Sequence, residues 1–191
     1  MAKINLKGLE LENVSLAHLF SKKFQEPFVL VDIGGRVTSV SVVDQGSLIM
    51  SYNIETAGGD ITQVIATALG ISPLRAEEIK KAYGLNIADK GDVRLNTLVI
   101  PLIDVIKREI EKAISSYYLK TRVKVEKIIL VGGGSNLKGL TEYLSKQLLL
   151  PVVRGNPFNM DLISYNPKLA VVLNEIGVTL TTACAVALEA F

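Results

Sequence analysis

The sequence predicts an α/β domain with a mixed β-sheet, and three observations support this. Short runs of apolar and β-branched residues, each closed by glycine or a turn, recur at residues 28–33, 38–44, 47–53 and 127–131, as is typical of buried strands. The first three are joined by turns too short for a crossover, so they cannot all be parallel. The intervening segments carry apolar residues at helical spacing, so helices are expected to flank the sheet.

The composition excludes several classes of function. With 49% apolar and 21% charged residues in 191, the chain is long and apolar enough for one folded domain. Its net charge of +2 gives no electrostatic basis for binding nucleic acid. The single cysteine, Cys184, and single histidine, His18, exclude an internal disulfide and a cysteine-clustered or two-histidine metal site. No apolar run approaches the roughly 20 residues of a membrane helix, so we expect no direct membrane span and a cytoplasmic protein.

Helical patterns occupy five segments between and around the strands. They are residues 15–23, 61–69, 73–83, 98–119 and 137–149. Asp60 is expected to cap the second helix, and Ser72 to cap the third, because these side chains accept hydrogen bonds from exposed N–H groups. Gly84 follows the third helix and is expected to end it.

The remaining segments are expected to be less regular. An extended piece is predicted at residues 9–14, a polar loop at 85–96 and a further extended piece at 152–154. The tail, residues 167–191, is apolar and compatible with helix, with a break near Gly177 because glycine weakens a helix interior.

The first strand ends in a glycine junction. Asp32 closes the strand, Gly34 and Gly35 follow it, and Thr38 begins the next strand. Glycines let backbone N–H groups approach a phosphate, and a carboxylate suits the metal ion that accompanies it. The alternative is a simple glycine hairpin in which the aspartate makes a turn hydrogen bond.

A second glycine junction follows the strand at residues 127–131. Gly132, Gly133 and Gly134 remove side chains where the chain leaves the sheet, and Ser135 follows. A flat base or ribose can lie against such a backbone; the alternative is close packing of strand and helix. The junction is not a phosphate-binding P-loop, because no Gly-Lys-Ser/Thr follows at the required spacing, and it is not a dinucleotide fingerprint.

The order of these motifs carries a family resemblance. Asp32-Ile-Gly-Gly, Ala57-Gly-Gly-Asp-Ile-Thr, Ala76-Glu-Glu-Ile-Lys and Leu130-Val-Gly-Gly-Gly-Ser together resemble the second lobe of the actin-like ATPases. Within that superfamily the chain is most similar to the FtsA and PilM branch. The segment 140–158, which ends in Asn-Pro-Phe, resembles the PilM family of type IV pilus assembly proteins.

The resemblance implies a fold and a division of the chain. The fold would be an actin-like ATPase (ribonuclease H-like) lobe, with a mixed sheet flanked by helices and a small inserted helical subdomain. Residues 1–27 would be the segment leaving a first lobe that this chain lacks. Residues 28–191 would form the second lobe, with the inserted subdomain at about 60–125.

The resemblance also implies a nucleotide site with two halves. In the phosphate half, Asp32 would face a metal ion through water, and Gly34, Gly35 and Thr38 would lie along the phosphates. The adenosine half would consist of Glu77, Lys80, Gly132, Gly133, Gly134 and Ser135. Glu77 and Lys80 share one helix face, and their alternative role is a surface ion pair.

Two departures from the family pattern affect the phosphate half. Arg36 and Val37 stand where the family usually has a glycine and a threonine. Val37 lacks a hydroxyl donor, and Arg36 places a bulky side chain in a loop expected to lie close to phosphate, although its charge could also pair with one.

The resemblance implies a scaffold function. ATP and Mg²⁺ would bind a complete two-lobed parent, while this chain alone would not hydrolyse ATP, because half of the groups around the γ-phosphate belong to the first lobe. No catalytic residue is therefore assigned. An inner-membrane protein of PilN type would bind the first lobe and place the protein at the membrane periphery, and self-association is a further possibility.

Two other readings of the same fold stay open. One is an FtsA-like cell-division protein, although residues 186–191 carry none of the lysines or arginines of a membrane-binding helix. The other is a fragment of a sugar-kinase-like enzyme.

Overall fold

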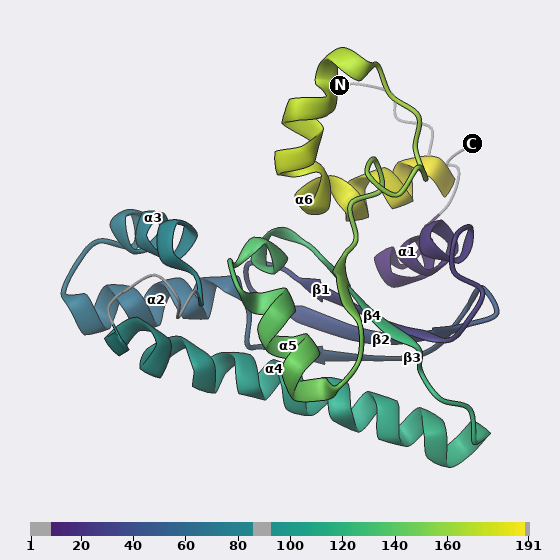
Figure 1. The fold of residues 1–191 in the computed structure, drawn as a ribbon, viewed down its shortest axis with the longest axis horizontal. Coiled ribbons are helices and arrows are strands. Elements are labelled where there is room, and N and C mark those ends of the chain that lie inside the picture. Colours follow the sequence, from purple (N-terminus) through teal and green to yellow (C-terminus); the bar gives the residue numbers. More distant parts are fainter. Residues whose placement is uncertain (1–8, 86–92, 190–191) are drawn as a thin grey trace.

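A five-stranded mixed sheet forms the centre of the molecule in the computed structural model, which describes residues 9–85 and 93–189 (Figure 1). The strands are β1 (Phe28–Ile33), β2 (Thr38–Asp44), β3 (Ser47–Ile54), β4 (Lys127–Val131) and β5 (Val152–Arg154). Their order is β3-β2-β1-β4-β5. β1 pairs antiparallel with β2 and parallel with β4, which confirms the predicted mixed sheet.

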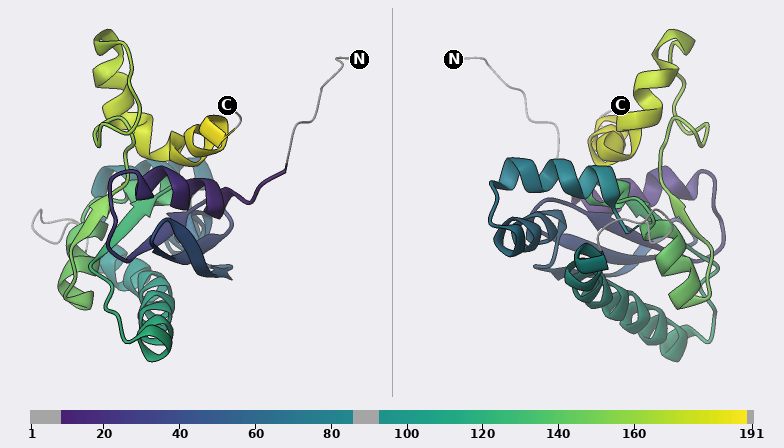
Figure 2. Two further views of the ribbon diagram at one scale, coloured as in Figure 1. Left: turned by 90° about the vertical axis from the view of Figure 1, so that its right-hand side faces the viewer. Right: turned by 60° about the vertical axis from the view of Figure 1, so that its left-hand side comes forward.

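Helices lie on both faces of this sheet. They are α1 (Glu12–Ser21), α2 (Gly58–Leu69), α3 (Pro73–Tyr83), α4 (Val93–Thr121), α5 (Leu140–Leu148) and α6 (Ala170–Glu189). α4 and α5 cover one face, and α1 and α6 lie on the other (Figures 1 and 2). α2 and α3 lie beyond the end of the sheet where β1 and β4 stop (Figure 1).

Alternation along β1 divides the core into two layers. Val29 and Val31 pack with the α2–α5 side, whereas Phe28 and Leu30 pack with α1 and α6, because successive side chains of a strand point to opposite faces. The expected apolar face of α4 is confirmed: its residues Ile106, Ile110, Ala113 and Tyr117 are fully buried.

The predicted inserted segment, residues 60–125, contains most of α2 and all of α3 and α4. α4 lies along the sheet, whereas α2 and α3 extend beyond its end (Figure 1) and still contribute Ile61, Ile65 and Ala76 to the same core. The segment 1–27 contains α1, which packs against α6. The division of the chain into these parts stays a prediction.

The predicted turn chemistry is confirmed at several positions. The β2–β3 hairpin turns at Gln45 and Gly46, whose φ angles of 47° and 78° suit the favoured two-residue hairpin turn. Ser72 caps α3 by accepting a hydrogen bond from the Arg75 N–H at 3.3 Å. Gly84 follows α3, as expected, with a φ of 59°.

Helices α1 and α4 begin before the residues that the sequence pattern predicts. α1 begins at Glu12, so the prediction of an extended piece at residues 9–14 is wrong over its second half. α4 begins at Val93 and contains Pro101, although proline normally favours a helix start. The predicted polar loop before α4 falls mainly on residues 86–92, which lie outside the described residues.

The starts of α2 and α5 also differ from the prediction. α2 begins at Gly58 with Ala57 as its N-cap, so Asp60 is not the cap; its carboxylate instead accepts a hydrogen bond from the Ala57 N–H at 2.8 Å. α5 begins at Leu140, after Gly139 in a left-handed conformation (φ 80°), and a short 3₁₀ turn, η1 (Gly133–Asn136), precedes it. A left-handed residue interrupts a helix, which explains the later start.

The predicted break near Gly177 is wrong, since α6 is continuous through this residue. α6 does bend sharply along its length (Figures 1 and 2). Asn156 donates a hydrogen bond to the Leu173 carbonyl at 3.0 Å, a group that in a regular helix accepts from residue 177. A side chain inserted into the helical ladder is a known cause of bending, and a Cβ on Gly177 would lie 2.3 Å from the Asn156 amide oxygen.

The expectation that no apolar segment is long enough to span a membrane needs correction for α6. Together with the turn η2 (Pro167–Leu169), α6 gives a helical stretch of 23 residues, Pro167–Glu189, in which an 18-residue window has a mean hydropathy of 1.7, so that length and composition would allow a membrane span. Core helices of folded domains share these properties, and α6 packs on α1 and β4 in this fold. Composition alone therefore does not exclude a span, and its absence stays a prediction.

Candidate functional site: a cleft lined by glycines

A cleft of about 1000 Å³ lies at the end of the sheet where β1 and β4 stop. Its walls come from the loop after β1, the start of α2, one face of α3, the turn after β4 and α6. The predicted site residues among its lining are Gly34, Gly35, Glu77, Lys80, Gly133 and Gly134. The fold therefore brings parts of both predicted halves to one place.

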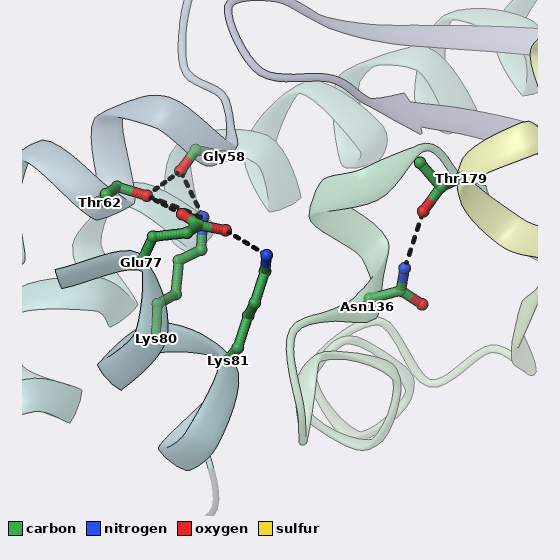
Figure 3. A network of polar contacts seen from close by, with 7 residues as sticks. All are labelled: Gly58, Thr62, Glu77, Lys80, Lys81, Asn136 and Thr179. Carbon is green, nitrogen blue, oxygen red and sulfur yellow. Dashed lines mark hydrogen bonds and ion pairs between the residues drawn. The ribbon is translucent and has the colours of Figure 1, made fainter. Parts of the chain in front are cut away.

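The α3 side of the cleft is held by a polar network (Figure 3). The Lys80 ammonium lies 2.6 Å from the Glu77 carboxylate, and it donates to the Thr62 hydroxyl at 2.8 Å and the Gly58 carbonyl at 2.9 Å. Thr62 in turn donates to Glu77 at 2.5 Å. The Lys80 side chain is 12% exposed, so it does not behave as the solvated surface ion pair of the alternative reading.

Hydrogen bonds within this network stabilise the ionised form of Glu77. Burial disfavours the ionised Glu77 carboxylate, but hydrogen bonds from Lys80 and Thr62 and the nearby charges of Lys80 and Lys81 hold the pKa of Glu77 below 4.5. At neutral pH the cleft therefore presents a carboxylate and an ammonium at fixed positions. The carboxylate can accept hydrogen bonds from the hydroxyls of a ribose, whereas the three N–H groups of Lys80 are taken by Glu77, Thr62 and Gly58 and hold that carboxylate in place.

The loop after β1 is fastened to the start of α2. The Gly58 N–H donates to the Gly34 carbonyl at 3.0 Å, and the Gly59 N–H donates to the Gly35 carbonyl at 2.9 Å. A Cβ on Gly59 would lie 2.5 Å from the Gly35 oxygen, so only glycine allows this approach. The first N–H groups of α2 are thus already paired within the chain, and any phosphate would meet the loop backbone instead.

Two predicted phosphate-side residues are absent from the lining of the cleft. Thr38 is fully buried, and its hydroxyl donates to the Thr56 carbonyl at 2.8 Å. Asp32 is not part of the cleft lining; its Oδ2 accepts a hydrogen bond from the Thr182 hydroxyl at 2.9 Å. Burial raises the pKa of Asp32, and the hydrogen bond from Thr182 opposes that rise. The roles of Asp32 and Thr38 toward metal and phosphate stay predictions.

The glycines after β4 serve packing as well as the cleft. Gly132 has a φ of 80° and donates its N–H to the Val178 carbonyl at 3.2 Å. A Cβ on Gly134 would lie 2.3 Å from the Ile33 side chain. The alternative role of close packing therefore applies to Gly132 and Gly134.

Gly133 differs from its two neighbours. A Cβ at this position would meet nothing nearer than Thr179, at 3.8 Å, and the residue lines the cleft. Ser135, also predicted to lie by the adenosine, is fully buried and donates to the Gly132 carbonyl at 2.6 Å. Of the four residues of this junction, Gly133 is the one whose surface is open to a ligand and free of a packing requirement.

Sequence reasoning missed the contribution of α6. Glu175 and Thr179 line the cleft, the Asn136 amide donates to Thr179 at 3.1 Å, and Thr182 contacts Asp32 (Figure 3 shows Asn136 and Thr179). Glu175, Thr179 and Thr182 recur at positions i, i+4 and i+7 within an otherwise apolar tail. That polar stripe on one helix face is the signal that would have pointed to them.

The residues present fit a nucleotide with a magnesium ion. The cleft volume lies in the range of ligand sites, and glycine backbone lines two of its walls. A half-buried carboxylate, Asp32, lies near the end of β1 beside Gly132. One carboxylate suits a cation that keeps most of its waters and takes further oxygens from phosphates, as Mg²⁺ does.

Comparison with known proteins identifies relatives of the same architecture. A family model described as type IV pilus assembly protein PilM matches residues 10–191. The cell division protein FtsA of Pseudomonas aeruginosa is 26% identical over 180 residues, which cover 80% of this chain and 43% of that protein. The sequence likeness to the FtsA branch is thus confirmed at the level of a distant relative.

Solved structures of other proteins superimpose on this fold. The PilM–PilN type IV pilus biogenesis complex superimposes with a TM-score of 0.80 at 23% identity, over 96% of this chain and 52% of that one. MreB5 of Spiroplasma citri bound to AMPPNP gives a TM-score of 0.62 at 14% identity, over 90% and 56%. The predicted actin-like fold is confirmed, and the chain spans about half the length of these proteins.

Proposed function

We propose that this chain, which belongs to the PilM family of type IV pilus assembly proteins, supplies the nucleotide-binding lobe of a pilus assembly scaffold. One observation carries the proposal. The cleft gathers Gly34 and Gly35, the Glu77–Lys80 network and Gly133, which lie far apart in the sequence. Glycine backbone beside fixed polar side chains is an arrangement suited to a phosphorylated nucleoside.

Each wall of the cleft suits a different part of the nucleotide. The ribose would meet Glu77 and Lys80, whose positions are fixed by their bonds to Thr62 and Gly58. The base would lie over Gly133, and the phosphates along the Gly34–Gly35 backbone. The similarity to a structure bound to AMPPNP supports this assignment.

Magnesium would accompany the nucleotide. When bound, the ion would neutralise part of the phosphate charge, and Asp32 is the residue proposed to hold its waters. The activity we propose for this chain is binding, with the Arg36 and Val37 departures weakening the phosphate side. Hydrolysis would require groups beyond those this cleft supplies.

The proposed partner is an inner-membrane protein of PilN type, met by a first lobe of the complete protein. The most informative structural neighbour is a complex of PilM with PilN, and this supports the partner. The complete protein would then lie on the cytoplasmic side of the inner membrane, held there by its partner.

Calorimetric titration of ADP with Mg²⁺ tests the proposed binding. Gly133→Val places a side chain in the cleft where the surrounding atoms leave room, so we expect a folded protein with at least a tenfold weaker affinity, a loss of about 1.4 kcal/mol. Ser115→Val, an exposed residue on α4, is the control and should bind as the wild type does. Wild-type affinity in Gly133→Val, or no binding by the wild type, would contradict the proposal.

A further inference from the structure

Asp32 is held by residues from distant parts of the chain. Its Oδ2 accepts the Thr182 hydroxyl at 2.9 Å across 150 positions of sequence. Its Oδ1 lies against Gly132, where a Cβ would come within contact distance. A carboxylate with one oxygen bonded and the other beside Gly132 keeps one orientation, because rotation about χ1 or χ2 would break the bond or meet the Gly132 backbone, while each oxygen retains a lone pair for a water.

We propose that Thr182 is a positioning residue, which holds the Asp32 carboxylate in the orientation needed to bind the waters of a nucleotide-bound Mg²⁺. The assignment rests on the proposed function. It extends the site to α6, a helix that contains none of the sequence motifs from which the site was predicted. Thr182 itself would touch neither nucleotide nor metal.

The surroundings of Thr182 show that α6 is fastened to the cleft at this level. The Val178 carbonyl accepts from the Gly132 N–H at 3.2 Å, and Thr179 accepts from the Asn136 amide at 3.1 Å. Both anchors attach α6 to the turn after β4. Thr182 lies on the same helix face one turn further along, so these anchors fix its hydroxyl opposite Asp32 before any ligand binds.

The neighbouring Thr181 provides a contrast on the same helix. Its hydroxyl is fully buried and donates to the Gly155 and Gly177 carbonyls at 2.7 and 3.0 Å. Thr181 therefore serves the packing of α6, whereas Thr182 is half-buried and its hydroxyl is directed at a carboxylate. A hydrogen bond to a charged acceptor is stronger than one between neutral groups, which suits a residue that must hold a charged side chain still.

The test compares nucleotide affinity with and without magnesium. ADP is titrated calorimetrically into the wild type, Thr182→Val, Thr182→Ser and Thr181→Val, each in Mg²⁺ and in EDTA. The magnesium-dependent gain is the ratio of the affinity for ADP in Mg²⁺ to the affinity in EDTA. We expect Thr182→Val to lose most of this gain, a drop of about tenfold for a gain of at least that size. In EDTA the variant should bind ADP as the wild type does. Thr182→Ser, which keeps the hydroxyl, should restore the gain.

The control separates positioning from stability. Thr181→Val should lower the melting temperature while leaving the magnesium-dependent gain intact, and Thr182→Ala replaces Thr182→Val if the valine variant does not fold. An unchanged gain in Thr182→Val, or a serine variant that fails to restore it, would overturn the assignment while leaving the nucleotide site in place. If the wild type binds no nucleotide, the proposed function fails first and the assignment falls with it.

Discussion

The two sides of the cleft are built in opposite ways. On the α3 side, Lys80, Glu77 and Thr62 bind one another along one wall of the cleft. On the β1 side, the Thr38 hydroxyl donates to the Thr56 carbonyl, the Asp32 carboxylate accepts from Thr182, and glycine backbone lines the cleft. In the proposed complex, side chains would therefore contact the nucleoside, whereas backbone groups would face the phosphates.

This difference between the two sides affects the free energy of ligand binding. Groups that are already fixed by their neighbours lose little conformational freedom when a ligand binds, so less of the interaction energy is spent on ordering them. On the α3 side this order comes from hydrogen bonds between side chains. On the β1 side it comes from close approach of glycines, as at Gly59 against Gly35.

The largest expected effect comes from Gly134→Val. A Cβ there would lie 2.3 Å from the Ile33 side chain and 2.9 Å from the Ile33 carbonyl oxygen, so we expect a loss of stability of about 3 kcal/mol. Urea unfolding measures it. The adjacent Gly133→Val should cost much less, and equal losses for the two variants would break the distinction between packing and ligand-facing glycines.

A smaller loss is expected from Thr38→Val. The substitution leaves the Thr56 carbonyl without its hydroxyl donor in a buried place, at a cost of about 1–3 kcal/mol. Affinity for ADP should stay within about twofold of the wild type, well below the tenfold that corresponds to 1.4 kcal/mol. A large drop in affinity at unchanged stability would show instead that the Thr38 hydroxyl serves the phosphates, as the family pattern implies.

The smallest effect, and a gain, is expected from Asp32→Asn. Burial raises the pKa of Asp32 in the folded chain above its ordinary 3.8, so the stability that this group contributes is present at low pH and is lost as pH rises through the folded pKa. At pH 7 the ionised carboxylate therefore lowers stability. The asparagine variant should melt higher than the wild type at pH 7, and the difference should shrink toward pH 3.

The reverse result for Asp32→Asn would be equally informative. A lower melting temperature at pH 7 would mean that the hydrogen bond from Thr182 stabilises the carboxylate more than burial disfavours it. Asp32 would then be a structural residue, and the β1 side of the cleft would no longer contrast with the α3 side.

Local patterns in the sequence were sufficient for much of the fold. Strands such as β4 appear as short apolar runs, and α3 carries its own start at Ser72 and its stop at Gly84. Glu77 and Lys80 share a helix face by spacing alone. These features depend on residues within one or two turns of each other, and such dependence is visible in a single sequence.

The features that sequence reasoning missed depend on distant contacts. The bend of α6 depends on Asn156, and the orientation of Asp32 depends on Thr182. The two roles of the glycines after β4 depend on Ile33 behind Gly134 and on open space beside Gly133. A pattern of three glycines gives no indication of which of them faces another segment and which faces a ligand.

The central claim is that one nucleotide lies across both sides of the cleft, and an NMR titration of the ¹⁵N-labelled chain with ADP and Mg²⁺ tests it most directly. We expect the backbone amide signals of Gly35, Lys80 and Gly133 to shift together and saturate at one ligand concentration. Signals of the separate hollow by Thr141 and Ser145 should not move. Shifts confined to that hollow, or to one side of the cleft, would contradict the claim.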